Sequence, residues 1–314
     1  MIYLACLPKF ATGGTELLHQ FGAALIARGV DVRILYHQAE GDPVPDRFRK
    51  YAVPYVADIV DASPDDVIIV PEVLTDLLYE WPQMRKVIWW LSIYFYFRSF
   101  YSKRNLRRRF LERKQFYRFG DQGVVHFVQS YYAEQFLRNK GVEVTGHLSD
   151  YLGDDFIAQA ARPLDGERQP IVLYNPKKGI RLTRRLMKYA KGVDFKAIEN
   201  MPPAEVARLM RTSAAYVDFG NHPGKDRIPR EAAISGAVVI VGRRGSAANG
   251  RDVPIEEKFK FVPTTKGLKN AAVLLQRVVK NHDAYDPFFK SYREMIVGER
   301  RVFERQVDAF IELM

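Results

Sequence analysis

The chain has 314 residues, of which 47% are hydrophobic and 13% aromatic, and a formal net charge of +11. This composition excludes a disordered chain, and the length favours two domains over a single hydrophobic core. Because Cys6 is the only cysteine, an internal disulfide and a cysteine-based metal cage are excluded, and a reduced cytosolic setting is expected.

The first forty residues predict a strand, a loop, a helix and a second strand. "IYLACL" is a short apolar run, "PKFATGG" interrupts it, and apolar residues then recur at helical spacing before "GVDVRILY". Gly13 and Gly14 fall in the predicted loop, where glycine lets the backbone approach a ligand and free amides at a helix start can receive a phosphate. A flexible turn without a ligand is the alternative for this pair.

Further apolar runs at 65–73, 86–93 and 123–130 predict buried strands, with helical stretches between some of them. Strands that alternate with helices indicate a parallel sheet covered on both faces.

An aromatic and basic segment follows the run at 86–93. Eight of the fourteen residues in 88–101 are aromatic, and 98–118 holds nine lysines or arginines against Glu112 alone, so this segment carries +8 of the net charge of +11. Such a segment suits an anionic membrane surface, an acidic glycolipid or a nucleic acid. Core aromatics beside arginines that face water are the alternative. The candidate membrane or acceptor patch comprises Arg104, Arg107, Arg108, Arg109, Arg113 and Lys114.

A polar stretch with two prolines at 157–170 is interpreted as a linker, which gives domains at 1–160 and 161–314. After it the alternation restarts, with strands predicted at 171–174, 193–198 and 214–220, a helix at 182–191 and another that Pro202 and Pro203 open. From Lys266 onward the chain is predicted to be mostly helical. The fold class is therefore α/β, with two Rossmann-like doubly wound halves, and ligands are expected at the carboxyl ends of the strands.

Two loops of the second half carry candidate binding residues. Lys177 and Lys178 follow the first strand in "NPKKG", where Lys178 can neutralise a diphosphate. A solvated basic loop is the alternative.

The second loop lies in "DFGNHPGKDRIPREAAISGAVVIV", residues 218–241. Gly224 permits close backbone approach, and Lys225 and Arg227 suit anionic groups. Glu231 is predicted in the first turn of the next helix, where it either grips two ribose hydroxyls or only complements the helix dipole. His222 is a candidate ligand contact, whereas His126, in an apolar run, is interpreted as a core residue.

No set of histidines and carboxylates has metal-ligand spacing and no Walker loop occurs, so neither a metal nor a cofactor is expected. The opening "MIYLACLPKF" lacks the features of a signal peptide, and the longest apolar run, 87–97, is too short to span a bilayer. The expected location is cytoplasmic, as a soluble protein or one peripheral to the inner membrane face.

Taken together, these motifs resemble those of bacterial GT-B glycosyltransferases, of the retaining, metal-independent kind that use nucleotide sugars. "GGTE" at 13–16 is similar to the family's loop after the first strand, and "SDY" at 149–151 stands where a Pro-Asn-Gly triplet precedes the second domain. "NPKKG" is similar to the Lys-Gly loop, and "HPGKDRIPREAAISGAVVIV" to the donor-binding loop and helix. The resemblance covers nearly the full chain, and the stretch from about 216 to 255 is its most specific part.

By this resemblance Glu231 would hold the ribose of a nucleotide sugar, Lys178 and Arg227 its diphosphate, and the first two glycines would admit the phosphates. The sequence departs from the family pattern at two positions: Pro223 replaces the first of two glutamates, and Leu173 replaces a diphosphate-binding arginine. No catalytic base is identifiable. The candidate donor-binding residues are Gly13, Gly14, Asn175, Lys177, Lys178, His222, Gly224, Lys225, Arg227 and Glu231.

The resulting hypothesis is a glycosyltransferase that moves a sugar from a nucleotide diphosphate sugar to a glycan or lipid-linked acceptor. A catalytically silent nucleotide-sugar-binding or scaffolding subunit is one alternative. An RNA-binding protein that uses segment 98–118 is the other, although no nucleic acid partner is expected.

Overall fold

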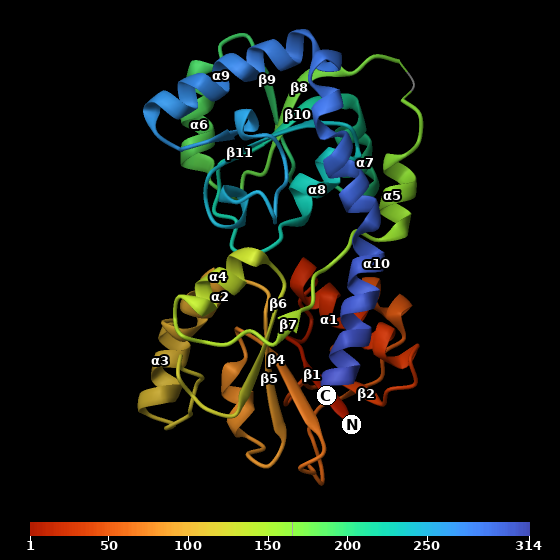
Figure 1. The fold of residues 1–314 in the computed structure, drawn as a ribbon, viewed down its shortest axis with the longest axis vertical. Helices are drawn as coiled ribbons and strands as arrows, with labels where there is room; N and C mark the ends of the chain where they lie inside the picture. The colour runs from red at the N-terminus through yellow and green to blue at the C-terminus, as the bar shows by residue number, and fades with distance from the viewer. Residues whose placement is uncertain (165) are drawn as a thin grey trace. The chain divides into compact units, whose positions relative to one another are not determined.

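The computed structural model describes residues 1–164 and 166–314, so residue 165 of the expected linker lies outside the described residues. The chain divides into two compact units (Figure 1). Unit 1 comprises Met1–Asp150 and Arg301–Met314, and unit 2 comprises Tyr151–Arg300. In the described part of the chain, no helix has both the length and the apolar character needed to cross a membrane.

Unit 1 is built around a seven-stranded sheet in the order β3-β2-β1-β4-β5-β6-β7, and all its pairings are parallel. The strands are β1 (Ile2–Ala5), β2 (Val32–Leu35), β3 (Tyr55–Val56), β4 (Val67–Pro71), β5 (Arg85–Trp90), β6 (Val124–Val128) and β7 (Gly146–His147). The helices are α1 (Gly13–Ile26), α2 (Ile93–Phe100), α3 (Lys103–Phe110) and α4 (Tyr131–Arg138), with the end of α10 (Lys290–Leu313). Short 3₁₀ turns occur at η1 (Asp46–Tyr51) and η2 (Thr75–Tyr79).

The two tryptophans of β5 show how this sheet is covered on both faces. Successive side chains of a strand point to opposite faces, and Trp89 and Trp90 are both fully buried. Trp89 contacts Phe21 of α1 with ring centroids 5.2 Å apart, and Phe21 in turn contacts Phe310 of α10 at 5.1 Å. Trp90 packs against Tyr96 of α2 on the other face at 5.2 Å. The interpretation of these aromatic residues as core is confirmed for the strand.

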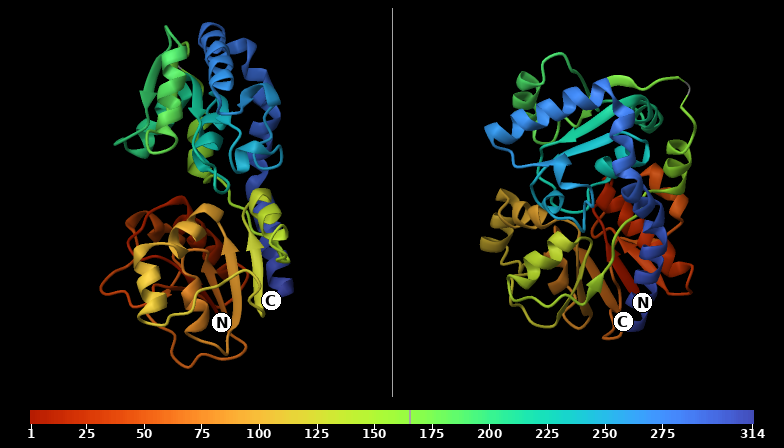
Figure 2. Two further views of the ribbon diagram at one scale, coloured as in Figure 1. Left: turned by 90° about the vertical axis from the view of Figure 1, so that its left-hand side faces the viewer. Right: turned by 45° about the horizontal axis from the view of Figure 1, so that its top comes forward.

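Unit 2 contains a five-stranded sheet in the order β12-β11-β10-β8-β9, again with parallel pairings. Its strands are β8 (Gln169–Tyr174), β9 (Asp194–Ala197), β10 (Ser213–Asp218), β11 (Val238–Gly242) and β12 (Lys260–Phe261). Its helices are α5 (Asp154–Ala160), α6 (Ile180–Tyr189), α7 (Pro203–Thr212), α8 (Arg227–Ile234), α9 (Thr265–Lys280) and the start of α10. Helices α6 and α9 lie along one face of the sheet, and α7 and α8 along the other (Figures 1 and 2), as right-handed crossovers require.

The observed division differs from the predicted domains 1–160 and 161–314. The first boundary falls at Asp150, and residues 301–314 return to unit 1. The polar composition of 157–170 predicted a connection, but the first residues of this stretch belong to α5, which packs against α7 and α8 of unit 2. The triplet at 149–151, which resembles the segment leading to a second domain, coincides with the observed boundary.

Candidate functional site

The strand order of unit 2 defines where a ligand can bind. From β8 the chain passes to β9 on one side and then returns to β10 on the other side of β8. The carboxyl ends of β8 and β10 therefore form the topological switch point, where the loops diverge and leave a crevice. The loops that leave these two strands, 175–179 and 219–226, are the two that the sequence predicts as binding loops.

Two glycines let these loops touch through their backbones. Gly179 has a φ of +57°, and a Cβ built on it would lie 2.4 Å from the backbone nitrogen of Gly220. Asp218 at the end of β10 accepts a hydrogen bond from the Gly220 nitrogen at 2.8 Å, which fixes the second loop as it leaves the strand. Only glycine at position 179 permits this approach.

Charged side chains gather where the loops meet. Lys178 Nζ lies 2.5 Å from Asp226 Oδ2, and His222 Nδ1 lies 2.9 Å from the same oxygen. On its other side, His222 Nε2 lies 3.6 Å from Asp218 Oδ1. The structure thus brings Lys178 and His222 together, and two carboxylates that the sequence did not identify as site residues hold them.

The charges of this cluster shift the pKa values of two of its members. Burial opposes a charge on His222, but Asp218 and Asp226 outweigh it and raise the pKa of the imidazole above its ordinary value. Burial also opposes a charge on Asp226, yet the close approach of the His222 imidazole and the charge of Lys178 hold the pKa of that carboxyl below its ordinary value. His222 is therefore more readily protonated, and Asp226 more readily ionised, than the same groups in water, and each favours the charge of the other.

Asp218, His222 and Asp226 also form the one set of possible metal ligands among the described residues, with ligand atoms within 4.8 Å of one another. A carboxylate–imidazole–carboxylate set can hold a divalent cation. Lys178 already supplies a positive charge to Asp226, so an ion there would have to displace that ammonium.

The loop after β11 holds the second binding loop, residues 219–226, in place through hydrogen bonds. Ser246 donates its backbone nitrogen to the His222 carbonyl at 2.8 Å and its hydroxyl to the Gly224 carbonyl at 2.6 Å. Gly245 has a φ of +60°, and a Cβ there would lie 1.9 Å from the His222 oxygen. Gly224 is thus buried and serves as a backbone acceptor within the loop.

Lys225, predicted to meet an anionic ligand group, has an internal partner. Its ammonium lies 2.9 Å from Oε1 of Glu299 on α10, and the buried guanidinium of Arg230 lies 2.6 Å from the other carboxylate oxygen. Arg230 also donates to the carbonyls of Lys225 and Asp226, at 3.2 and 3.3 Å. Sequence analysis missed Arg230 and Glu299, because their partners come from distant segments.

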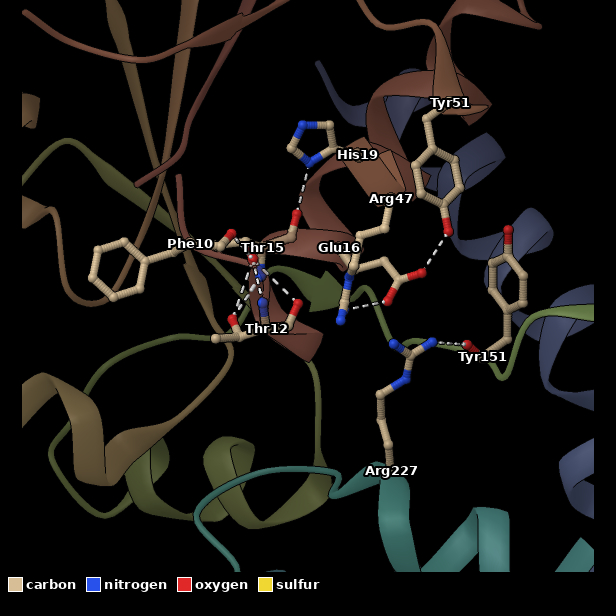
Figure 3. A network of polar contacts seen from close by, with 9 residues as sticks. All are labelled: Phe10, Thr12, Thr15, Glu16, His19, Arg47, Tyr51, Tyr151 and Arg227. Carbon is tan, nitrogen blue, oxygen red and sulfur yellow. Dashed lines mark hydrogen bonds and ion pairs between the residues drawn. The ribbon is translucent and has the colours of Figure 1, made fainter. Parts of the chain in front are cut away.

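The prediction that Glu231 lies in the first helical turn is wrong. Helix α8 begins at Arg227 after the N-cap residue Asp226, so Glu231 is one turn further along, on the same face as Arg227. Pro229 is the third helical residue, a position whose backbone nitrogen needs no intrahelical partner. The Arg227 guanidinium donates to the Tyr151 carbonyl at 3.5 Å (Figure 3).

Glu231 nevertheless shares the surroundings of the charged cluster. Burial raises the pKa of Tyr216 well above its ordinary value, and the nearby charges of Asp218, Asp226 and Glu231 raise it further. One tyrosine on β10 therefore experiences all three carboxylates.

Asn175 and Lys177 shape the first loop. The Asn175 side-chain oxygen accepts a hydrogen bond from the Lys177 nitrogen at 2.9 Å, which is an Asx turn. Leu173, at the position of the family's arginine, is fully buried in the core of unit 2. No cation stands at that position.

In unit 1, Gly13 and Gly14 are the first residues of α1 and not part of a preceding loop. Thr12 caps the helix and exchanges hydrogen bonds with Thr15, which is why the helix starts at Gly13. Glu16 accepts hydrogen bonds from Arg47 and from Tyr51, each at 2.9 Å (Figure 3). The start of α1 thus presents backbone amides beside a carboxylate that is already compensated.

The basic segment divides into compensated and uncompensated side chains. Arg108 lies 2.5 Å from buried Asp76, Lys114 pairs with Glu80, and the Arg109 guanidinium lies 4.1 Å above the Phe100 ring. Among the described residues, Arg104, Arg107 and Arg113 make no ion pair. His126 is a core residue as predicted: it accepts a hydrogen bond from Trp90 at 3.1 Å, and burial lowers its pKa to about 4.

Comparison with solved structures identifies the fold. The chain matches sucrose-phosphate synthase from Thermosynechococcus elongatus with a TM-score of 0.64 and 16% identity, over 99% of this chain and 98% of that one. It matches Anabaena HepE in complex with UDP and glucose (TM-score 0.61, 11% identity, 100% and 99% coverage). It also matches WaaG, a glycosyltransferase involved in lipopolysaccharide biosynthesis (0.60, 12%, 100% and 99%).

These neighbours are GT-B glycosyltransferases, and the chain has the GT-B fold, as predicted. No protein-family model matches the sequence, and neither does any curated protein.

Proposed function

We propose that this protein is a nucleotide-sugar-dependent glycosyltransferase that transfers a sugar to a glycan or lipid-linked acceptor. The observation that carries the proposal is the meeting of two loops at the switch point of unit 2, where Lys178, His222 and Asp226 lie together. Lys178 would move from Asp226 to the diphosphate of the donor, and the Glu231 carboxylate would accept hydrogen bonds from the ribose hydroxyls. Arg227 would contribute further positive charge.

Catalysis would then rest on stabilising the departing nucleoside diphosphate. Once the Lys178 ammonium has moved to the diphosphate, it and the backbone amides at the start of α8 would already be in place as the leaving group departs. We infer that this arrangement works without a metal and, from the family resemblance, with retention of the anomeric centre. The UDP named in the HepE structures supports the choice of UDP as the first probe.

The test is isothermal titration of the full chain with UDP. We expect binding that weakens about tenfold or more in Lys178→Met and in Glu231→Ala, because each change removes a charge-assisted hydrogen bond. The matched control is Lys188→Met, which removes an exposed lysine near the end of α6 and should leave the affinity unchanged. Affinity should also survive a chelator. Absence of UDP binding, or equal affinity in Glu231→Ala and the native chain, would contradict the proposal.

A second candidate, a nucleotide-sugar-binding subunit without activity, is favoured by the burial of Leu173 in the core, which leaves the diphosphate one cation short of the family pattern. Turnover of UDP-glucose by the purified chain separates the two candidates. Release of UDP supports the enzyme, whereas tight binding without release across the common UDP-sugars supports the silent subunit.

A further inference from the structure

Unit 1 has its own topological switch point, between β1 and β4, and a cavity of about 830 Å³ lies there. Leu7 and Phe10 after β1, Leu74 after β4 and Phe95 of α2 form its apolar walls. The cavity thus lies at the carboxyl ends of neighbouring strands where the strand order reverses, as the charged cluster of unit 2 does. The basic segment, which the donor site does not use, supplies the remaining wall.

Arginines dominate the charge of this cavity. Its lining includes Arg98 of α2 and Arg104 and Arg108 of α3. Of these three arginines, only Arg108 forms an ion pair with Asp76. Within the described parts of the chain, Arg98 and Arg104 make no ion pair. Arg104 and Arg108 are one helical turn apart, so both project from the same face of α3.

An adjoining hollow of about 450 Å³ extends the basic surface. It shares His37, Gln38, Arg104 and Arg108 with the larger cavity, and it adds the cations Arg107 and Lys114 and the carboxylates Glu80 and Glu112. His37 Nδ1 is buried without a hydrogen bond among the described residues, and it lies 3.9 Å from Asp58 Oδ1. The N-cap residue Ser102 also lines the larger cavity, so the start of α3 faces it.

We propose that this cavity binds a phosphate group of the acceptor, with the attached sugar or carrier against the apolar wall. Guanidinium groups match phosphate oxygens with paired hydrogen bonds, and two uncompensated arginines suit a dianion better than a carboxylate. The concave shape distinguishes this site from a flat membrane contact. The inference rests on the proposed function, because it names the chemical class of the acceptor.

The experiment titrates the full chain with glucose 6-phosphate, glucose, glucuronate and farnesyl diphosphate, and measures UDP affinity on the same samples. We expect glucose 6-phosphate or farnesyl diphosphate to bind more tightly than glucose and glucuronate. The stronger of the two phosphates identifies whether a sugar or the lipid carrier bears the group. Arg98→Gln with Arg104→Gln should weaken phosphate binding about tenfold or more. Arg113→Gln with Arg118→Gln removes the same charge outside both cavities and should leave phosphate binding unchanged.

Three results would overturn the inference: no preference for phosphates over glucose, glucuronate binding as tightly as glucose 6-phosphate, or equal losses in the two double variants. If the Arg98 and Arg104 variant instead lost only its sedimentation with anionic vesicles, the arginines would be a membrane contact. Retained UDP affinity in any of these cases shows that the acceptor inference alone has failed. If the native chain did not bind UDP, that result would instead count against the proposed function.

Discussion

At the scale of single residues, Glu72 is a buried carboxyl that no ion pair compensates among the described residues. It follows β4 and accepts a hydrogen bond from the Leu91 nitrogen at 2.9 Å, just before the cap of α2. Burial raises its pKa from 4.5 to about 7. The folded state therefore binds more protons than the unfolded state between these two pH values, and the free energy of unfolding falls as pH rises through that window.

We predict that Glu72→Gln removes this pH dependence. The amide oxygen can still accept from Leu91 but carries no charge, so the variant should gain about 3 kcal/mol over the native chain between about pH 4.5 and pH 7. Urea denaturation followed by tryptophan fluorescence measures it, since Trp81, Trp89 and Trp90 all lie in unit 1. The exposed Glu112→Gln is the control and should track the native chain. Parallel curves for Glu72→Gln and the native chain would contradict the prediction.

Gly179 offers a sharper test of the loop contact. In Gly179→Ala the new Cβ would meet the Gly220 backbone, so the loops must separate and UDP affinity should fall about tenfold. Gly192→Ala is the matched control, because Gly192 also has a positive φ, +75°, but nothing within 4 Å of its Cβ. Titration with UDP compares them. Equal affinities in the two variants would show that the close approach does not support binding.

How far the sequence predicts the site depends on how local each contact is. Lys178 and His222 were predicted because each lies in a loop that directly follows an apolar strand. Their partners were not, since the pairing of Lys178 with Asp226 depends on the strand order β10-β8. Lys225 was predicted to bind a ligand because the sequence does not show that its ion-pair partner is Glu299, which lies far along the chain on α10.

At the scale of elements, the buried ion pair between Arg230 and Glu299 fastens α10 to α8. Both side chains are almost fully buried. We predict that Arg230→Met costs about 3 to 5 kcal/mol of stability, because it leaves Glu299 buried without its main partner. Adding Glu299→Leu should recover much of the loss, since Lys225 can turn toward solvent. Thermal unfolding measures both; a double variant no more stable than Arg230→Met would refute this account.

The predicted elements agree with most strands and miss some helix starts. The strands could be predicted from the sequence, because buried parallel strands appear in it as continuous apolar runs. Helix starts depend on capping contacts: Thr12 begins α1 at Gly13, and Ser92 begins α2 where a strand was expected to continue. The rule that places proline in the first helical position misplaced α8, since Pro229 is its third residue.

For the whole molecule, the basic segment predicts attraction to anionic membranes. Phe110 and Leu111 are 74% and 73% exposed beside Arg107 and Arg113. We predict that Phe110→Ser with Arg107→Ser and Arg113→Ser abolishes sedimentation with anionic vesicles and leaves UDP affinity intact. Arg108 is left unchanged, because its replacement would leave the buried carboxylate of Asp76 without its ion-pair partner. Unchanged sedimentation would refute the membrane contact, and steeply salt-dependent RNA binding would favour the RNA-binding alternative.

The return of α10 to unit 1 has a consequence for synthesis on the ribosome. Phe310 covers Phe21 of α1 and Phe127 of β6, with ring centroids 5.1 and 5.0 Å apart. A nascent chain that has emerged only as far as Asp150 therefore has all seven strands of its first sheet but leaves this face uncovered. Unit 1, although its sheet is translated first, therefore becomes complete only after residues 301–314, which follow all of unit 2 in the chain, have been translated.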